Sequence, residues 1–195
     1  MRIAATGIQS ALSSQALRER DRSDVYVRLS PIHGMGLFTR RTFGTGETML
    51  VRDERPVTPK QPLFAAKGEI EAHCARLEGG RQVYLGYPER FINHSCDPNA
   101  FLRRLDGRNH VVALRPIRPR DEVVVHYGVN LSDGVPWQCN CGSERCLGLI
   151  PGHFFSLPID VQIELSPLLA PWFVAEHQDA YRAFVREAGL PEEQD

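Results

Sequence analysis

A mostly β fold, with helices confined to the C-terminal part, is predicted by two features of the sequence. Between residues 25 and 127 the apolar residues fall in short runs broken by Gly, Pro, Asn or Asp, which is typical of short strands joined by turns. A long helical pattern begins only at Ile159. The chain has 195 residues, enough for one domain with a core and some appendages, and 42% of them are hydrophobic, as expected of a globular protein.

The N-terminal part is predicted to begin with a leader and to continue with strands. Residues 1–24 are polar and predict a flexible leader with a short helix at Ala11–Arg20. Alternation of apolar and polar residues predicts a strand at Val25–Leu29, and a turn at residues 43–47 precedes a second strand at Thr48–Arg52. The segment Ala65–Leu77 has a helical pattern, which Gly79-Gly80 would end.

Further short strands are predicted up to residue 127. Asp106-Gly107 is typical of a two-residue hairpin turn, so the runs on either side of it are expected to pair. The predicted strands are Val83–Leu85, Phe91–Ile92, Ala100–Arg104, His110–Leu114 and Glu122–Tyr127.

Residues 153–195 are predicted to form a helical extension. The helical pattern runs over Ile159–Leu190 and is broken near Pro167 and Pro171. Gly189 suits the end of the last helix, in which one apolar stripe recurs at helical spacing. We interpret the stripe as a packing face; covering a substrate groove and forming a dimer are the alternatives. Its members are Ala180, Tyr181, Phe184, Val185 and Ala188.

Composition and charge exclude several classes of function. The formal net charge of -1 disfavours direct binding to nucleic acid, because proteins that grip phosphate backbones are usually much more basic. The longest apolar runs are too short to span a bilayer, and residues 1–8 show no secretory signal, so an intracellular protein without membrane contact is expected, nuclear if its source is eukaryotic. Among the 23 Lys and Arg residues only Lys60 and Lys67 are lysine, a preference that often follows genome composition.

The clustering of cysteines predicts a metal site. Cys139, Cys141 and Cys146 are spaced as C-x-C-x4-C, and Zn²⁺ prefers four thiolates in a tetrahedron. Cys96 and Cys74 are the other two cysteines, and we favour Cys96 as the fourth ligand because it lies in a polar, turn-like stretch, whereas Cys74 lies in the predicted helix. His94 is a competing ligand.

Several motifs of this chain resemble those of the SET family of protein-lysine methyltransferases. The stretch RFINHSCDPN at residues 90–99 matches the central motif of that family almost letter for letter. The cysteine cluster followed by LGLI is similar to the post-SET zinc segment of the family, in which the fourth ligand comes from the central motif. Two further matches are HGMGLF at residues 33–38 and the run RPIR to DEVVVHYG at residues 115–128, which resemble the first and last motifs of the family.

The resemblance implies a fold, a cofactor and a set of site residues. The implied fold consists of small twisted sheets around a pseudoknot, and the implied organisation is a SET domain at residues 25–130 followed by a post-SET zinc segment at residues 131–152. S-adenosylmethionine would bind on one face, and a lysine side chain of a substrate protein would enter from the other. Tyr127 is the candidate catalytic residue. The candidate cofactor-binding residues are Gly34, Met35, Gly36, Arg90, Phe91, Asn93 and His94.

The candidate side chains suit methyl transfer, which needs a neutral, well-oriented amine more than a strong acid or base. Free lysine has a pKa near ~10.4, and a dry channel beside a positive sulfonium would lower it. A tyrosine hydroxyl and backbone carbonyls could then orient the nitrogen. The glycines would let the backbone approach a ligand closely, and Arg90 could meet either the carboxylate of the cofactor or a structural acid.

The chain departs from the family pattern at two places. Many SET enzymes carry a tyrosine in a Glu-x-x-Gly-Glu-like stretch where this chain has Val51–Pro56, so one aromatic of the usual lysine cage is either missing or supplied by Tyr84, Tyr87 or Phe91. Several members carry Phe or Tyr where this chain has Val125. These departures keep two alternatives open: a catalytically impaired SET-like interaction module, and a zinc-ribbon adaptor without cofactor. The number of methyl groups, a histone substrate and the oligomeric state are left open.

Overall fold

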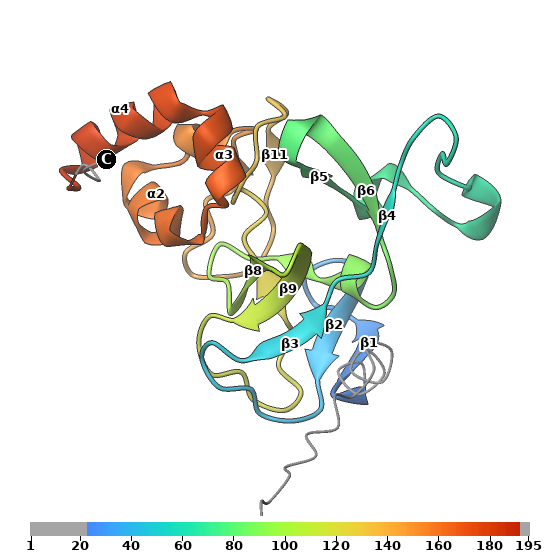
Figure 1. The fold of residues 1–195 in the computed structure, drawn as a ribbon. Helices are drawn as coiled ribbons and strands as arrows, with labels where there is room; N and C mark the ends of the chain where they lie inside the picture. Colours follow the sequence, from blue (N-terminus) through green and yellow to red (C-terminus); the bar gives the residue numbers. More distant parts are fainter. Residues whose placement is uncertain (1–22, 192–195) are drawn as a thin grey trace, which may run out of the picture.

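The computed structural model describes residues 23–191, so the expected leader helix at Ala11–Arg20 lies outside the described residues. In the described part, the strands form small sheets of two or three strands and the main helices follow them in the sequence (Figure 1). This arrangement confirms the predicted mostly β fold with C-terminal helices. No helix between residues 23 and 191 is both long enough and apolar enough to cross a membrane.

The first sheet carries the glycine loop. Strand β1 (Val25–Leu29) pairs with β2 (Met35–Thr39) in antiparallel fashion, and the backbone N–H of Ser30 donates to the carbonyl of Gly34 in the loop between them. Gly34 has a φ of +49°, which glycine adopts without the steric cost that a side chain would bring. The predicted strand at Val25–Leu29 is confirmed.

A second sheet contains the predicted hairpin. Strands β8 (Ala100–Leu105) and β9 (Arg108–Ala113) pair directly, and β3 (Thr48–Val51) adds to β9 to give the order β3-β9-β8. The turn residues Asp106 and Gly107 have φ values of +49° and +74°, and positive values at both positions are what a type I′ turn requires. The hairpin prediction is therefore confirmed.

The predicted helix at Ala65–Leu77 is wrong. The segment forms two short 3-10 turns, Ala65–Lys67 and Glu71–His73, and then strand β5 (Cys74–Leu77). Gly68 ends the first turn with a φ of +72°, and Ile70 is extended, so the helical pattern is interrupted twice. Strand β5 pairs with β6 (Arg81–Leu85), and β6 also pairs with β4 (Glu54–Pro56). In β5 the backbone N–H and C=O groups are therefore bonded to a neighbouring strand instead of within a helix.

Two segments far apart in the sequence meet in a short parallel pair. Strand β7 (Asn93–His94) lies beside β10 (Val124–Val125), with Asn93 opposite Val124 and His94 opposite Val125. Strand β10 is shorter than the predicted strand Glu122–Tyr127, and β7 directly follows the predicted strand Phe91–Ile92 instead of coinciding with it. Residues 89–91 form a 3-10 turn instead of a strand, and the side chain of Asn99 bonds the backbone N–H of Val124 and the carbonyl of Glu122, positions that a longer β10 would pair through its backbone.

The last third of the chain forms a small hairpin and a helical layer (Figure 1). Strand β11 (Trp137–Gln138) pairs with β12 (Leu149–Ile150), and the 3-10 turn Phe154–Ser156 leads into the helices. The expected breaks near Pro167 and Pro171 and the expected helix end at Gly189 are confirmed, and Gly189 is left-handed with a φ of +63°. The helical elements are α2 (Ile159–Leu165), the 3-10 turn Ser166–Leu168, α3 (Pro171–Glu176) and α4 (Gln178–Ala188).

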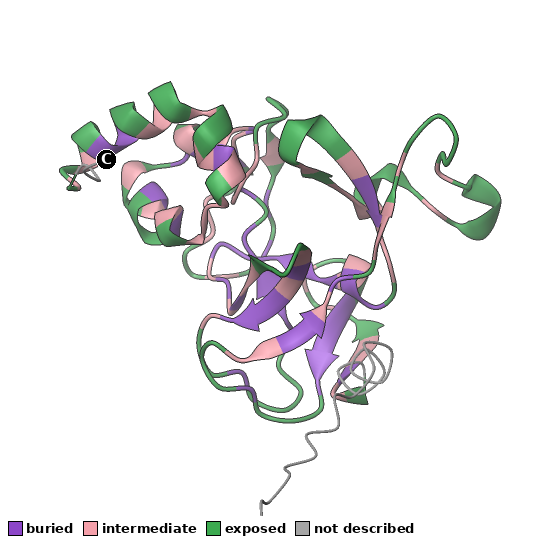
Figure 2. Cartoon of the chain, viewed as in Figure 1, coloured by how far each residue is buried: buried purple, intermediate pink, exposed green. Residues whose placement is uncertain are grey.

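Besides the cluster around Ile150 and the cysteines, two apolar cores hold the described parts together. The first is aliphatic and is built on β2, β3 and β9, where Figure 2 shows the buried residues gathered; Leu37, Val111 and Ile117 are fully enclosed in it. The second lies under the helices and contains Phe154 and Phe173, both 0% exposed. In α4, Phe184 and Val185 are buried and the other members of the predicted stripe are half-buried, so the stripe is a packing face.

The helical layer also contacts the tip of the β5–β6 hairpin. The carboxylate of Glu176, the last residue of α3, accepts a hydrogen bond of 2.7 Å from the backbone N–H of Gly79. Gly79 and Gly80 have φ values of +67° and +68°, so the tip turns through two left-handed residues. The helical layer thereby fixes a loop that lies 97 positions earlier in the sequence.

Candidate active site and metal centre

The parallel pair of β7 and β10 brings the candidate catalytic tyrosine to the Asn-His motif. Tyr127 lies two residues beyond β10, and its backbone N–H donates to Nδ1 of His94 at 3.1 Å. Its hydroxyl donates to the backbone carbonyl of Ile92, which directly precedes β7, at 2.6 Å. Tyr127 is therefore bound at both ends to the same three-residue stretch, Ile92 to His94.

Tyr127 is 46% exposed as a residue, but its phenol group is desolvated by the surrounding protein. Burial of the phenol, followed by the nearby charge of Glu122, raises the pKa of Tyr127 to about 12. The side chain is thus a neutral phenol at physiological pH. It can donate or accept a hydrogen bond and so orient a substrate atom, but its protonation state does not change during a reaction near neutral pH.

Asn93 connects β7 to the glycine loop. Its side-chain amide donates to the carbonyls of His33 and Met35 at 3.2 and 3.1 Å and to the carboxylate of Glu122 at 2.8 Å. The two N–H bonds of the amide are therefore directed at protein acceptors. Asn93 would therefore contribute to a ligand site indirectly, by holding the loop at residues 33–35, where Gly34 and Met35 are exposed.

Glu122 is a member of the site that sequence reasoning missed. Its carboxylate accepts hydrogen bonds from Asn93 and from the hydroxyl of Ser30 at 2.8 Å. A Cβ on Gly36 would lie 2.3 Å from Oε1 of Glu122, so the absence of a side chain at Gly36 makes room for this carboxylate. The group that the backbone of Gly36 approaches closely is therefore Glu122. A half-buried acid in an apolar run, DEVVV, was the signal that could have identified it.

Four thiols gather on the other side of the His94 ring, next to its Nε2. The sulfur of Cys139 lies 3.8 Å from that of Cys96 and 3.7 Å from that of Cys146, and the backbone N–H of Cys96 donates to the sulfur of Cys141 at 3.5 Å. Ligand atoms of His94, Cys96, Cys139 and Cys141 all lie within 4.8 Å of one another. Cys74 bonds instead to the carbonyl of Ile70 in the β4-β6-β5 sheet region. The donor set suits Zn²⁺, which favours thiolate ligands.

The thiols of this cluster differ in acidity. Burial raises the pKa of Cys139, and the neighbouring thiols add to the rise. For Cys141, burial also acts to raise the pKa, but hydrogen bonds from the backbone N–H groups of Cys96 and Ser143 and from the neighbouring thiols lower it to about 7. A thiolate is the form that binds metal, so the lowered pKa of Cys141 suits a metal ligand.

The ring nitrogen of His94 that faces the thiols, Nε2, is the protonated one. Burial, and then the proximity of His126, lower the pKa of His94 to about 3, so the ring is neutral. Because a backbone N–H can only donate, Nδ1 is the acceptor toward Tyr127 and the single ring hydrogen lies on Nε2, which is 3.4 Å from the sulfur of Cys96. A protonated Nε2 donates to sulfur and does not ligate a metal, which favours Cys146 over His94 as the fourth ligand.

Comparison with known proteins decides the family. A family model described as SET domain matches residues 34–128, which span the glycine loop, β7 and Tyr127. The chain contains a SET domain. Within the matched residues, the sheets β3-β9-β8 and β4-β6-β5 and the pairing of β7 with β10 are the form that this SET domain takes.

Curated relatives extend the similarity beyond the SET domain. Histone-lysine N-methyltransferase 2B of Homo sapiens is 32% identical over 148 residues, covering 70% of this chain and 6% of that protein. Histone-lysine N-methyltransferase trithorax of Drosophila virilis is 30% identical over 155 residues, covering 72% and 4%. A histone-lysine N-methyltransferase of Aspergillus oryzae described as H3 lysine-36 specific is 37% identical over 133 residues, covering 66% and 12%. The chain thus spans a small part of each of these relatives.

In this SET domain, an ion pair occupies the stretch where many family members carry a tyrosine. Arg52 is 6% exposed, and its Nε lies 3.2 Å from the carboxylate of Glu54. Burial lowers the pKa of Arg52, while the charges of Glu54 and Glu89 oppose that shift. The position is therefore filled by a buried cation held by acids, and any aromatic wall must come from other residues.

Arg90 and Phe91 belong to an aromatic cluster on the β6 side of Ile92. The guanidinium of Arg90 lies 5.0 Å from the ring centre of Phe91 and 5.9 Å from that of Tyr87, and it donates to the hydroxyl of Tyr84 at 3.4 Å. Tyr84 is buried, whereas Tyr87 is 54% exposed. The sequence suggested that Arg90 binds either the carboxylate of the cofactor or a structural acid. In the structure its guanidinium instead contacts two aromatic rings and the hydroxyl of Tyr84.

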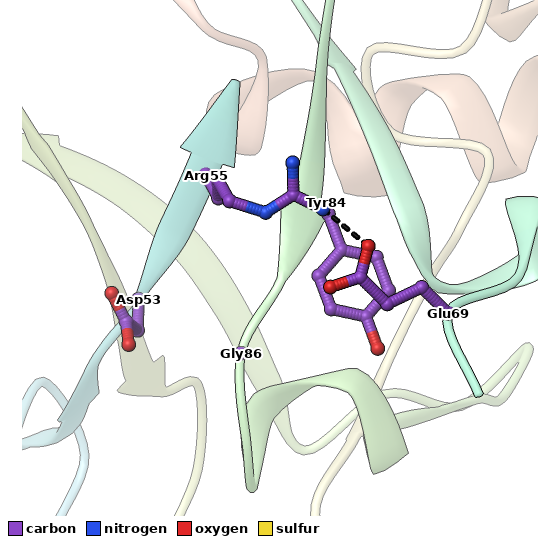
Figure 3. Close-up of a pocket in the computed structure, with 5 residues that line it drawn as sticks. All are labelled: Asp53, Arg55, Glu69, Tyr84 and Gly86. Atoms are coloured by element: carbon purple, nitrogen blue, oxygen red, sulfur yellow. Dashed lines mark hydrogen bonds and ion pairs between the residues drawn. The ribbon is translucent and has the colours of Figure 1, made fainter. Parts of the chain in front are cut away.

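A shallow cavity of about 210 Å³ lies next to this cluster (Figure 3). Figure 3 shows its lining residues Asp53, Arg55, Glu69, Tyr84 and Gly86, and the ion pair between Arg55 and Glu69. It is separate from Asn93, His94 and Tyr127, none of which lines it.

Proposed function

We propose that this chain transfers a methyl group from S-adenosylmethionine to the side-chain amine of a lysine in a protein substrate. The observation that carries the proposal is the hydroxyl of Tyr127, held at 2.6 Å from the carbonyl of Ile92 within a SET domain. A phenol and a carbonyl side by side can direct the lone pair of an amine and can attract an electron-poor methyl group. The relatives that cover most of this chain are named histone-lysine N-methyltransferases, which supports the same reaction.

The chemistry makes modest demands on the side chains. S-adenosylmethionine supplies a methyl group on a positively charged sulfur. The amine nitrogen forms the new C–N bond as the C–S bond breaks, the electron pair of that bond stays on sulfur, and one proton leaves the nitrogen for solvent. Tyr127 keeps its own proton throughout, because its pKa is raised to about 12. Its task is orientation, which can supply most of the rate when reacting atoms are held in line.

Residues beside Tyr127 fit a nucleoside cofactor. The backbone of Gly34 and Met35 is exposed, and a Cβ on Gly34 would meet nothing within 4 Å, so a ligand has room there. Trp137 lies 6.1 Å from the ring of Tyr127 and offers an aromatic surface. We assign Gly34, Met35, Asn93 and His94 to the shaping of this site, the last two through their bonds to the loop and to Tyr127.

We further propose that one structural zinc ion is held by Cys96, Cys139, Cys141 and Cys146. The thiol contacts and the donating Nε2 of His94 support this set. Four cysteines leave no open coordination position, so the ion would cross-link residue 96 to the segment at residues 131–152 rather than take part in the reaction. The proposal keeps residues 25–130 as the SET domain and residues 153–195 as a helical extension, and it requires an intracellular setting in which thiols stay reduced.

The test is methyl transfer by the purified, zinc-loaded protein. Radiolabelled S-adenosylmethionine is incubated with the protein and with either purified histones or a lysate of the native host, because the names of the relatives make histones the first substrates to examine. Label in protein that survives acid hydrolysis as methyl-lysine is the expected result. Binding of S-adenosylmethionine in a calorimeter without any transfer would favour an impaired interaction module, and absence of binding would favour a zinc adaptor.

A further inference from the structure

His94 stands between the thiol cluster and Tyr127 with both ring nitrogens in contact. Nδ1 accepts the hydrogen bond from the backbone N–H of Tyr127 at 3.1 Å, and Nε2 lies 3.4 Å from the sulfur of Cys96. A neutral imidazole has one donor and one acceptor, and each has a partner here. The ring therefore has no free nitrogen for a cofactor and none for a metal.

The contacts of His94 continue in both directions. On one side Cys96 leads to Cys139, whose sulfur lies 3.8 Å away. On the other side Tyr127 leads through its hydroxyl to the carbonyl of Ile92. Since Ile92 and His94 are two residues apart, the reactive hydroxyl is fixed in a small closed ring of contacts, and one member of that ring also touches the metal cluster.

The imidazole is held in place by its neighbours. His94 is 5% exposed, and its ring centre lies 4.8 Å from that of His126, 4.9 Å from that of Trp137 and 5.5 Å from that of Tyr127. Trp137 belongs to β11, which pairs with β12 on either side of the cysteine segment. A change in the cysteine segment therefore reaches His94 through the sulfur of Cys96 and through the ring of Trp137.

We propose that His94 is a positioning residue that couples the zinc-bound sulfur of Cys96 to the catalytic tyrosine. Nε2–H donates to the thiolate, and Nδ1 holds the backbone of Tyr127 in the position from which its hydroxyl reaches Ile92. The inference rests on the proposed function for its kinetic consequence, but the coupling itself is a property of the protein without substrate. Metal loss then displaces Tyr127 while the aliphatic core stays folded.

Two substitutions separate the two halves of the coupling. Asparagine ends about where Nδ1 lies, so His94→Asn can keep an acceptor for Tyr127 and removes the donor to Cys96. Glutamine reaches to about the position of Nε2, so His94→Gln can keep a donor to Cys96 and removes the acceptor for Tyr127. His110→Gln on β9 is the matched control, because His110 lies in the β3-β9-β8 sheet, away from the thiols.

The readouts are zinc release to a chelator, the affinity for S-adenosylmethionine, kcat and KM with the same labelled substrate, and amide exchange at Tyr127. Partners that orient metal ligands typically contribute about 10–100-fold to metal affinity or activity. We expect His94→Asn to release zinc about 10-fold faster, and His94→Gln to lower kcat about 10-fold with cofactor affinity and KM changed less than about 2-fold. Exchange at Tyr127 should rise in His94→Gln and rise less in zinc-saturated His94→Asn.

Other results overturn the proposal. If both variants weaken S-adenosylmethionine binding and leave kcat unchanged, His94 binds the cofactor. If both lose the zinc entirely while Cys146→Ser retains it, His94 is a ligand. A wild type that transfers no methyl group to any substrate, but in which the zinc and exchange results appear as expected, refutes the proposed function and leaves the coupling intact.

The wild-type protein provides a test that does not depend on the folding of a variant. When zinc is removed by a chelator, exchange at Tyr127 should rise several-fold before exchange rises at Val111 and Val112, which lie in the aliphatic sheet and are buried. If Tyr127 keeps its protection in the zinc-free protein, or loses it only together with Val111 and Val112, the coupling does not exist.

Discussion

The surroundings of His94 and of Phe173 are both buried, but different forces hold them together. Around His94 the strands are two residues long, and hydrogen bonds and closely spaced sulfurs accompany the ring contacts of His94. Around Phe173 the contacts are aromatic: Phe155 stacks on it at 5.9 Å and Phe154 meets it edge-on at 6.3 Å between ring centres. With the proposed zinc bound, the first region would depend on the metal and on protonation, whereas the second depends on buried area.

The comparison implies that the two regions respond to different perturbations. Burial of aromatic surface is indifferent to chelators and depends little on pH, whereas thiolate ligands must be deprotonated and a zinc site loses its binding free energy with its metal. Each of the following predictions changes one region and uses the other as an internal reference.

Loss of a metal ligand should have the largest effect. Structural zinc contributes about 10–16 kcal/mol of apparent binding free energy in zinc-finger peptides, so Cys96→Ser should lose the metal and expose the cysteine segment. We expect no zinc by elemental analysis, and fast amide exchange at residues 137–150 with protection retained around Phe173. Cys74→Ser is the control and should keep one zinc per chain; full zinc in Cys96→Ser together with loss in Cys74→Ser would refute the ligand set.

Truncation of the aromatic core should come next. Phe173→Ala leaves a cavity in a fully enclosed position, which typically costs about 3–5 kcal/mol in the free energy of unfolding. Urea denaturation measures the loss, and the zinc content of the folded variant should equal that of the wild type. Ile163→Ala, at a residue 39% exposed on α2, should cost about 1 kcal/mol or less. Zinc loss in Phe173→Ala would mean that the two regions are one unit.

Removal of one hydroxyl should affect the reaction far more than the fold. Tyr127→Phe keeps the ring and should lower kcat by about 100- to 1,000-fold, or roughly 3–4 kcal/mol, as when one preorganised donor is removed from an active site. Thermal stability should fall by only about 1 kcal/mol, the value of one hydrogen bond. Tyr26→Phe on β1 is the matched control. Wild-type turnover by Tyr127→Phe would make Tyr127 a packing residue and remove the centre of the proposed mechanism.

The contact between the two regions should have the smallest effect. Arg145, in the cysteine segment, forms an ion pair with Glu164 on α2, and both side chains are about half exposed, at 49% and 46%. A pair in water contributes only about 0.2–1 kcal/mol. A double-mutant cycle with Arg145→Gln and Glu164→Gln measures that coupling free energy. Any effect of metal loss that is the same in all four proteins of the cycle cancels from the coupling free energy.

The coupling of this pair should vanish in acid. The hydrogen bond from Arg145 holds the pKa of Glu164 below its usual value, despite the opposing effect of burial. A folded-state pKa below the unfolded value gives stability that is present above the unfolded pKa and is lost as the pH falls through the folded pKa. Coupling that persists unchanged once Glu164 is protonated would show that the charge of Glu164 contributes nothing to it.

The sequence carried much of the fold because several elements depend on local residues. Asp106-Gly107 predicted the hairpin, Pro167 and Pro171 predicted the breaks between helices, and Gly189 predicted the end of the last helix. The segment at residues 65–77 was predicted wrongly because its apolar spacing is compatible with a helix, and its true partner, β6, lies in a later part of the chain.

The candidate site was accessible from motifs, but its internal bonding was not. Residue types and spacing pointed to Tyr127 and to the cysteines. The contact between Gly36 and Glu122 joins residues that no local pattern links, and the two partners of His94 depend on how β7 and β10 align. The metal set and the cofactor residues stay predictions until zinc and S-adenosylmethionine binding are measured.

Because Gly79 donates a hydrogen bond to Glu176, the protease sensitivity of the β5–β6 hairpin tip should depend on whether the helical layer is intact. Gly79 and Gly80 form an exposed tip whose anchor on the opposite side is a single carboxylate at the end of α3. A protease that nicks the chain before residue 176 would free that carboxylate, and the tip would become the next bond to be cut. Limited proteolysis should therefore yield ordered fragments, with cleavage near residue 79 following cleavage between residues 166 and 176.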